Sequence, residues 1–406
     1  MTVTSGLRRA AAQNHSMAAV RSYGKELTYG EVWDRGVRVA NGLRALGLQP
    51  GDRLATLEDN CLESSDLIFG AAIANVARVP LYRKNSGEAH RKMIMQTGCK
   101  ALFVSTEALP EIEGIDLEGV QIVLRDEGYE DWLAKQSNED PQTLVDPDDI
   151  FVIRHSSGTT GTPKGAVLTH QAWVDAGRDI FYMVPPVNLG DRCLLTGPIS
   201  HGSGYLLWPV WMKGGCAVVE SHDPERTIDL FCNEDIAYYF GVPIMIEGLV
   251  QHAGEKGSCT FPALKAILIA GAPMFTNLAL KAHEVFGDVL YQWYGQTEVA
   301  MGSCMGPKEW FSEVPGSEPL RSVGRIAPFC EVEARDENNQ PVPVGESGEI
   351  AVRCDGRMRE LWGQPEMTAE RLIDGLGAHG RHRLHRRQWL SLPGRSSRRH
   401  DHFRRI

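Results

Sequence analysis

The chain has 406 residues, of which 42% are apolar and 23% are charged, and its formal net charge at pH 7 is −10. This length exceeds what one hydrophobic core usually organises, so we expect an ordinary globular protein with two or more subdomains. The negative charge argues against a nucleic-acid partner, although a local basic pocket for an anionic substrate stays compatible with it.

The cysteines and the apolar runs indicate in which cellular compartment the protein is expected. Nine cysteines occur without a C-x-x-C pair or regular spacing, and no secretory segment follows Met1. We therefore expect reduced thiols, mostly as small core residues, in a cytoplasmic protein. The longest apolar stretch, residues 67–82, is interrupted by Asn75 and Arg78 and is too short for a bilayer, so no integral membrane segment is expected.

Helices and strands are expected to alternate along the chain. Apolar residues recur at helical spacing over 32–48, where Gly47 and the turn at 49–52 end the helix. Strand-like runs are expected at 53–57, 101–105, 120–124, 150–153, 217–220, 264–270 and 288–293, and a further helix at 277–286. This alternation predicts layered α/β architecture.

One loop concentrates donors for an anion. Residues 156–165 read Ser-Ser-Gly-Thr-Thr-Gly-Thr-Pro-Lys-Gly and directly follow an apolar run. Glycines let backbone N–H groups converge on one point, while hydroxyls and the Lys164 ammonium add further donors. We predict a phosphate-binding loop, with ATP as the leading ligand. A Walker A loop is excluded because Pro163 and Gly165 flank the lysine. The alternative is a flexible Gly/Thr surface turn.

Three later segments follow or precede predicted strands. Gly271-Ala272-Pro273 follows one strand, and the segment from Tyr294 to Glu298 follows the next. Residues 322–325 precede a β-rich region that reaches Ile350. Ligands in open α/β folds bind at the carboxyl ends of the strands, so these segments are candidates for one site.

In this order and spacing, the segments resemble the adenylate-forming (AMP-binding) superfamily of acyl-CoA synthetases, luciferases and peptide-synthetase adenylation domains. The resemblance runs from about residue 27 to residue 375. It implies an α/β fold, namely the large N-terminal domain of that family, with two layered α/β subdomains and a β-barrel-like subdomain. It also implies an AMP-forming acid–thiol ligase that uses ATP, Mg²⁺ and coenzyme A.

The resemblance also implies a set of nucleotide-binding residues. The phosphates would be held by Ser156, Ser157, Gly158, Thr159, Thr160, Gly161 and Lys164, and the adenine would lie between the backbone of Gly271, Ala272 and Pro273 and the ring of Tyr294, with Gly295 as a further nucleotide-binding residue. Thr297 would lie near the α-phosphate, and Glu298 would hold Mg²⁺. A tyrosine offers a flat face for a purine, and a carboxylate beside a triphosphate needs a hard cation. The alternatives are a core aromatic residue at 294 and a solvated acid at 298.

A substrate pocket is implied by a Pro-x-x-His pattern at 198–201. Its histidine, His201, would border the carboxylate and acyl pocket together with Gly202, Val242 and Gly295; the alternative is a structural histidine. With Thr159, Lys164 and Glu298, His201 completes the candidate catalytic set. The pocket positions His201, Gly202, Val242 and Gly295 offer no acid to a substrate amine, which favours an aliphatic or aryl carboxylic acid of medium to long type.

Two residues depart from the family pattern. Before the loop's Ser-Gly, the family commonly has an aromatic residue preceded by an apolar one, where this chain has His155 and Arg154. Nucleotide affinity could be affected, although both positions only flank the donors.

The resemblance implies two chemical steps and leaves the acceptor open. The acid would attack the α-phosphorus of ATP, and a thiol would then displace AMP. Our first expectation is an acyl-CoA ligase of fatty-acid metabolism. An acyl-AMP ligase or carrier-protein-loading domain is the alternative enzyme. From another class, a non-catalytic nucleotide-binding remnant also fits the sequence.

The composition changes abruptly after Gly375. Residues 376–406 contain nine Arg, five His, no Lys and one acid, so this segment carries +8 and the rest of the chain −18. The family's Asp-Gly-Trp-x-x-Thr-Gly-Asp motif, whose last Asp binds ribose, matches only as far as Gly375. Permitted codons for the tail, read one base out of frame, can spell the missing motif. We therefore expect an AMP-binding domain over 1–375 and a basic, disordered, out-of-frame tail over 376–406. The alternative is a solvated basic tail. We also expect the ribose-binding Asp and the small C-terminal domain to be lost, and activity to be impaired.

Overall fold

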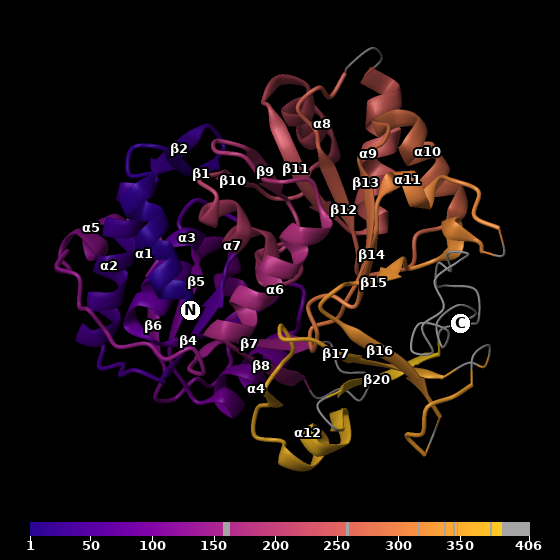
Figure 1. Cartoon of the computed structure of the whole chain (residues 1–406). Helices are drawn as coiled ribbons and strands as arrows, with labels where there is room; N and C mark the ends of the chain where they lie inside the picture. Colours follow the sequence, from indigo (N-terminus) through magenta and orange to yellow (C-terminus); the bar gives the residue numbers. More distant parts are fainter. Residues whose placement is uncertain are drawn as a thin grey trace. The chain divides into compact units, whose positions relative to one another are not determined.

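The computed structural model describes residues 1–156, 163–256, 260–315, 317–336, 338–343, 346, 348–373 and 376–383. The chain divides into two compact units (Figure 1). Unit 1 comprises Met1–Gly177, Val187–Ser221 and Met358–Pro365, and unit 2 comprises Arg178–Pro186, His222–Arg357 and Glu366–Ile406.

Unit 1 contains a mixed sheet with the strand order β18-β8-β7-β4-β3-β5-β6. Its strands are β3 (Arg53–Leu57), β4 (Ala77–Pro80), β5 (Cys99–Ser105), β6 (Gln121–Arg125), β7 (Ile150–Ser156), β8 (Lys164–Thr169) and β18 (Glu360–Leu361). The strands from β7 to β6 run parallel, whereas β8 pairs antiparallel with β7 and with β18. Such a sheet needs cover on both faces.

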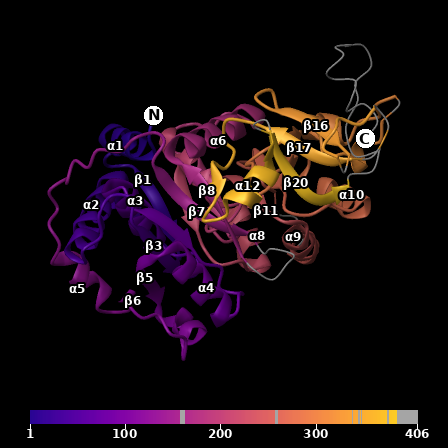
Figure 2. The ribbon, with the colours of Figure 1, turned by 90° about the horizontal axis from the view of Figure 1, so that it is seen from below.

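Helices cover both faces of this sheet (Figure 2). The helices of the unit are α1 (Val3–Gln13), α2 (Tyr29–Ala45), α3 (Ser64–Ala74), α4 (Gly87–Thr97), η1 (Thr106–Ile112), α5 (Tyr129–Ala134), α6 (His170–Met183, up to Gly177 in this unit) and α7 (Gly204–Met212). On one face, Met93 and Ile94 of α4 share a buried core with Leu102 and Val104 of β5. On the other, Phe103 meets Trp132 of α5 edge to face, at 5.5 Å between ring centroids.

A second group of strands in unit 1 is β1 (Ala18–Ser22), β2 (Lys25–Thr28), β9 (Arg192–Leu195) and β10 (Cys216–Val219). Strands β9, β10 and β1 are parallel, and β2 closes a hairpin on β1. The link from β9 to α7 carries the predicted Pro-x-x-His segment.

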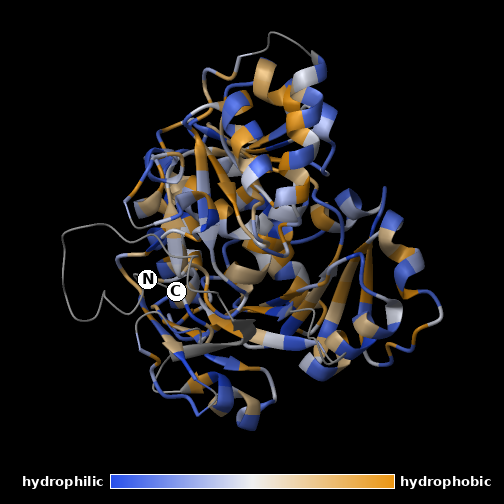
Figure 3. Cartoon of the chain, turned by 90° about the vertical axis from the view of Figure 1, so that its right-hand side faces the viewer, coloured by the Kyte–Doolittle hydropathy of each residue, from blue (hydrophilic) through white to orange (hydrophobic). Residues whose placement is uncertain are grey.

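Unit 2 begins with parallel strands β11 (Ile236–Gly241), β12 (Ala266–Ile269) and β13 (Leu290–Tyr294), followed by antiparallel β14 (Ser303–Met305) and β15 (Arg325–Ile326). Its helices are α8 (Pro224–Asn233), α9 (Pro243–Lys256), α10 (Thr276–Phe286), α11 (Pro307–Trp310), η2 (Pro319–Arg321) and α12 (Pro365–Arg371, from Glu366 in this unit). In Figure 3 the central strands are largely orange, and the helices show both orange and blue residues, as amphipathic helices do.

The β-rich region of unit 2 is an antiparallel sheet of order β16-β17-β20-β19. Its strands are β16 (Glu331–Arg335), β17 (Glu349–Arg353), β19 (Leu372–Ile373) and β20 (Leu376–Arg383). The first eight residues of the predicted basic tail thus form a strand paired with β17. Residues 384–406 lie outside the described residues, so disorder of the tail stays a prediction.

Most predicted elements are present, with small shifts at their ends. The helix predicted over 32–48 begins earlier, at Tyr29, because Thr28 and Glu31 form a capping box: the Glu31 carboxylate accepts from the Thr28 N–H at 2.7 Å. The apolar stretch 67–82 covers most of α3 and then β4, with Asn75 in the left-handed conformation at φ 56° between them.

Most of the cysteines that the structure describes follow the prediction. Cys99, Cys193, Cys216, Cys304 and Cys354 are free and buried, as expected for core residues. Cys232 is disulfide-bonded, so the expectation of reduced thiols throughout is wrong at this position.

Candidate functional site

The ends of the predicted phosphate loop are held together by a hairpin in unit 1. Strand β7 ends at Ser156 and β8 begins at Lys164, and these two residues are direct antiparallel partners. Lys164 is half-buried. The residues between them that we assigned to phosphate binding, Ser157, Gly158, Thr159, Thr160 and Gly161, lie outside the described residues. Their roles stay predictions.

The two departures from the family pattern are buried at the end of β7. Burial lowers the pKa of His155 to about 4, so this imidazole is neutral at pH 7. A Cβ at Gly165 would lie 2.8 Å from Cγ2 of Ile153 and 3.2 Å from Nε2 of His155, so the neighbouring strand offers no room for a side chain. Arg154 donates from Nε to the Ser200 carbonyl at 3.2 Å and lies over the Tyr205 ring at 4.6 Å. It therefore ties β7 to the segment that carries His201.

The side chain of Asn60 holds the backbone that leads to His201 through hydrogen bonds. Its Nδ2 group donates to the carbonyls of Gly197 at 2.7 Å and Leu195 at 3.1 Å, and its Oδ1 accepts from the Ile199 N–H at 3.1 Å. The side chain is buried, so these bonds are shielded from water. Sequence reasoning missed this residue. The signal that could have found it is a polar run, Glu58 to Asn60, directly after an apolar strand.

His201 is a neutral, half-buried imidazole. Its Nδ1 shares a hydrogen bond of 2.8 Å with the Ser200 hydroxyl, and its ring lies 5.1 Å from that of Tyr82. Burial, and then the positive charge of Arg154, lower the pKa of His201 to about 4. This histidine can accept or donate a hydrogen bond to a substrate without carrying charge. Gly202 follows it and is half-buried as well.

In unit 2, three predicted segments meet at the carboxyl ends of adjacent parallel strands. Gly241 of β11 is in register with Ile269 of β12, which is in register with Gln292 of β13. Val242, residues 271–273 and Tyr294 therefore lie at one edge of the sheet. Gly271 has φ +86°, and a Cβ there would lie 3.1 Å from Cγ1 of Val242, so glycine suits this close approach. Residues 271–273 are exposed and accessible to a ligand.

A tight turn presents Tyr294. The Gly302 N–H donates to the Tyr294 carbonyl at 2.8 Å, and the indole N–H of Trp293 donates to the Ala300 carbonyl at 3.0 Å. A Cβ at Gly295 would collide with that same Ala300 carbonyl. This turn therefore leaves no room for a side chain at position 295.

The predicted metal residue lies in this turn. Thr297 and Glu298 are half-buried. Burial, opposed by a hydrogen bond with Gln296 and reinforced by the Glu298 carboxylate, raises the pKa of Tyr294 to about 12. Glu298 is therefore close enough to act on the tyrosine electrostatically. Over the residues that the structure describes, no three His, Cys, Asp or Glu side chains form a metal cluster. A single carboxylate suits Mg²⁺ that is held mainly by the oxygens of a phosphate substrate.

The candidate residues fall into two groups. Unit 1 holds Ser156, Lys164, His201 and Gly202, and unit 2 holds Val242, Gly271, Ala272, Pro273, Tyr294, Gly295, Thr297 and Glu298. Within the described ranges, no helix is both long and apolar enough to cross a membrane.

Comparison of the amino-acid sequence with known proteins identifies a family and several relatives. The AMP-binding enzyme family matches residues 7–362. A feruloyl-CoA synthase from Amycolatopsis sp is 31% identical over 376 residues, which are 91% of this chain and 73% of the relative. The fatty acid–(acyl-carrier-protein) ligase ScoC from Streptomyces coeruleorubidus is 29% identical and aligns with 88% of this chain and 70% of its own length.

A solved structure supports the fold. The N-terminal domain of FACL13 from Mycobacterium tuberculosis aligns with a TM-score of 0.84 at 22% identity, over 94% of this chain and 96% of that domain. The predicted fold class, a layered α/β adenylate-forming N-terminal domain, is confirmed.

Proposed function

Because this chain belongs to the AMP-binding enzyme family, we propose that it activates a carboxylic acid with ATP and passes the acyl group to the thiol of coenzyme A. The observation that carries the proposal is the meeting of Val242, residues 271–273 and Tyr294 at the carboxyl ends of three adjacent strands. Ligands of such sheets bind there.

In the first step, a carboxylate oxygen of the acid attacks the α-phosphorus of ATP, and the bond to pyrophosphate breaks. The exposed backbone at 271–273 and the ring of Tyr294 offer the adenine a polar edge and a flat face. Thr159, Thr160 and Lys164 would hold the phosphates, Thr297 would lie near the α-phosphate, and Glu298 would share Mg²⁺ with the phosphate oxygens. The ion would neutralise charge on the leaving pyrophosphate.

In the second step, the sulfur of coenzyme A attacks the acyl carbonyl, and the bond to AMP breaks. Neutral His201 would border the acyl group without introducing a charge. The acid would be aliphatic or aryl, since no acidic side chain is assigned to the pocket. Positioning, rather than covalent chemistry by the protein, would supply most of the rate.

The test is a panel of aliphatic and aryl acids incubated with ATP, Mg²⁺ and coenzyme A. Pyrophosphate and AMP release and the acyl-CoA product are measured for the 406-residue chain and for a frame-corrected chain. Lys164→Ala should lower the rate about 100-fold or more, whereas Lys213→Ala, at an exposed lysine, should leave it unchanged. Equal rates for Lys164→Ala and Lys213→Ala would contradict a catalytic role of the phosphate loop.

A second acceptor is favoured by the 29% identity with a fatty acid–(acyl-carrier-protein) ligase. A carrier protein would then replace coenzyme A, while the first step stays the same. Mass spectrometry of acyl-CoA against acylated carrier protein, from the same reaction, decides between the two acceptors.

A further inference from the structure

Two free cysteines face each other at the open end of the hairpin formed by β16 and β17 in unit 2. The two strands pair antiparallel, with Val332 directly opposite Val352. Two positions further along the same register, Cys330 is opposite Cys354. Side chains alternate between the faces of a sheet, so both thiols lie on the face of the two valines. That face belongs to a buried core, which includes Cys354 and against which Cys330 packs.

The two thiols are in contact. Both cysteines are free, and the Cys330 side chain is hydrogen-bonded with that of Cys354. The Cys330 N–H donates to the Ala327 carbonyl at 2.9 Å, so it is not used across the hairpin. Opposed residues that are not hydrogen-bonded to each other have Cα atoms about 4.5 Å apart, and a disulfide spans Cα separations of about 4.4–6.8 Å. A disulfide here therefore needs little movement of the backbone.

Cys330 also connects this pair to the turn between β13 and β14. Its thiol donates to the Met301 carbonyl at 3.1 Å. The next residue, Gly302, donates from its N–H to the Tyr294 carbonyl at 2.8 Å and so closes the turn. A thiol has a single proton, which is lost when its sulfur enters a disulfide. Oxidation of Cys330 would therefore remove the donor from Met301.

We propose that Cys330 and Cys354 form a thiol switch: an organic disulfide oxidises the pair to a disulfide, Met301 loses its donor, and the turn after Tyr294 opens more often. The proposal rests on these contacts and not on the adenylation activity, because the cross-link and the turn are both measured without ATP, acid or coenzyme A.

The chemistry consists of two successive thiol–disulfide exchanges. The half-buried Cys330 sulfur loses its proton to water and attacks one sulfur of the oxidant, whose S–S bond breaks and releases a first thiolate. The deprotonated Cys354 sulfur then attacks the Cys330 sulfur, and the mixed S–S bond breaks and releases a second thiolate. The two cysteines lose two electrons, which reduce the oxidant to two small thiolates, and these take up the two protons.

The surroundings make this oxidation slow at neutral pH. The hydrogen bond with Cys354, then burial, then negative charge that includes the Asp355 carboxylate raise the pKa of Cys330. The thiolate is the attacking species, so the rate of oxidation should rise with pH. The pair would thus stay reduced during a brief exposure to an oxidant.

The first test looks for the cross-link. The 406-residue protein is incubated with hydroxyethyl disulfide, a small neutral oxidant, at about pH 8.5, near the ordinary pKa of a thiol. The remaining thiols are then alkylated, and the digested protein is analysed by mass spectrometry. The expected result is a peptide that joins Cys330 to Cys354 and that dithiothreitol separates. Absence of this peptide overturns the proposal.

A second pair of cysteines is the matched internal control. Cys193 and Cys216 lie on the neighbouring strands β9 and β10, but Cys193 is opposite Ala217. Adjacent residues of a strand point to opposite faces, so these two thiols lie on different faces of their sheet. Both are buried, and they should stay unlinked. Equal cross-linking of the two pairs would mean that contact between thiols does not decide the reaction, against the proposal.

Two variants resolve the steps. Cys354→Ala lacks the second thiol, so a mixed disulfide between Cys330 and the oxidant should accumulate in place of the cross-link. Cys330→Ser keeps a hydroxyl that can donate to the Met301 carbonyl, but it cannot form a disulfide, so it should give neither product. If Cys354→Ala collects no mixed disulfide, Cys330 is not the attacking thiol and the proposal is wrong.

Hydrogen exchange measures the turn. The N–H of Gln296 donates to the Val299 carbonyl and that of Gly302 to the Tyr294 carbonyl. After oxidation of the wild type, these two amides should exchange at least about threefold faster than in the reduced protein, as expected when one supporting hydrogen bond is lost. Unchanged exchange in fully cross-linked protein refutes the switch.

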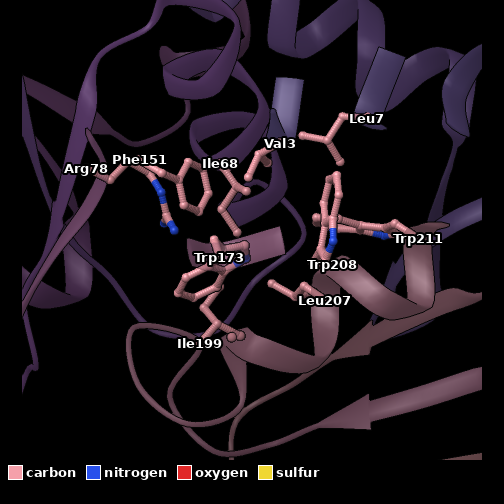
Figure 4. Close-up of a pocket in the computed structure, with 11 residues that line it drawn as sticks. Val3, Leu7, Ile68, Arg78, Phe151, Trp173, Ile199, Leu207, Trp208 and Trp211 are labelled. Atoms are coloured by element: carbon pink, nitrogen blue, oxygen red, sulfur yellow. The ribbon is translucent and has the colours of Figure 1, made fainter. Parts of the chain in front are cut away.

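The Cys330→Ser variant also separates the switch from non-covalent binding of the oxidant. Figure 4 shows an apolar pocket of unit 1, and none of the described residues that line it is a cysteine. Binding in such a place would act alike on the wild type and on Cys330→Ser, whereas the switch acts on the wild type alone. The expected result is faster exchange in the wild type only. An equal change in the two proteins overturns the proposal.

Discussion

Asn60 shows how one buried amide can position a candidate substrate residue. It faces the carbonyls of Leu195 and Gly197 and the N–H of Ile199, and so fixes the backbone that leads into His201. An aspartate at this place has nearly the same shape but cannot donate to the two carbonyls. The side chain therefore acts through the segment rather than on the substrate.

We predict that Asn60→Asp lowers the free energy of unfolding by about 2–3 kcal/mol, because buried carbonyls lose their donor. It should also raise KM for the acid while leaving KM for ATP unchanged. Urea unfolding and steady-state kinetics measure the two effects. The control is Asn41→Asp, whose amide donates to the Ser137 and Glu139 carbonyls in a less buried place and should cost less. Loss of stability with both KM values unchanged would make Asn60 purely structural.

Buried histidines should make stability depend on pH. Burial lowers the pKa of His155 from 6.5 to about 4. As pH falls through this window, the unfolded chain takes up a proton that the folded chain does not, so the free energy of unfolding falls.

Because of His155, the free energy of unfolding of the wild-type protein should fall by up to about 1.4 kcal/mol per pH unit. Between pH 6 and pH 5, the free energy of unfolding of His155→Gln should fall correspondingly less. Urea unfolding at the two pH values measures the difference. His15→Gln, at an exposed position, serves as the control. Identical slopes for wild type and His155→Gln would contradict the assignment of a depressed pKa.

At the scale of the element, the turn between β13 and β14 holds the candidate adenine-binding ring. Val299 of this turn packs in one core with Val332 of β16 and with Ile350 and Val352 of β17, and Tyr294 lies against that core. The turn is therefore held by strands β13 and β14 at its ends and by the packing of Val299 against β16 and β17.

Gly295→Ala should disrupt the turn, because its Cβ would collide with the Ala300 carbonyl. We expect a loss of about 1–3 kcal/mol in the free energy of unfolding, together with weaker ATP binding, measured by urea unfolding and calorimetry. Gly254→Ala is the matched control: its Cβ would meet nothing within 4 Å, and alanine in α9 should be neutral or stabilising. Equal ATP affinity in both variants would contradict a role for this turn in nucleotide binding.

The elements that the sequence predicted best are the buried strands. The run 53–57 is strand β3 residue for residue, because apolar residues between turn signals leave little alternative. Helix α3 and strand β4 were harder to separate, since 67–82 is mostly apolar and α3 is buried on all sides. The site segments 271–273 and 294–298 could be predicted because a glycine and a tyrosine follow or end predicted strands. Asn60 was not, because its importance depends on contacts with residues far away in the chain.

At the scale of the whole molecule, the break in composition after Gly375 supports the proposal of a shifted reading frame. We predict that the gene, read one base out of phase from this point, encodes the family's ribose-binding motif. The frame-corrected chain should adenylate at least about 100-fold faster than the 406-residue chain, since misplacement of reacting groups costs about that much. Sequencing of the gene and pyrophosphate release measure both parts. Comparable rates for the two chains would contradict the proposal.

The central claim is attack of a carboxylate on the α-phosphorus of ATP. It is tested by incubating the frame-corrected protein with ATP, coenzyme A and an acid whose carboxylate carries heavy oxygen, followed by mass spectrometry of the AMP. The account predicts AMP that carries one heavy oxygen atom from the acid, because the bond from the acid to phosphorus survives when the thiol attacks the carbonyl. AMP or ADP released without label, while acyl-CoA forms, would contradict it.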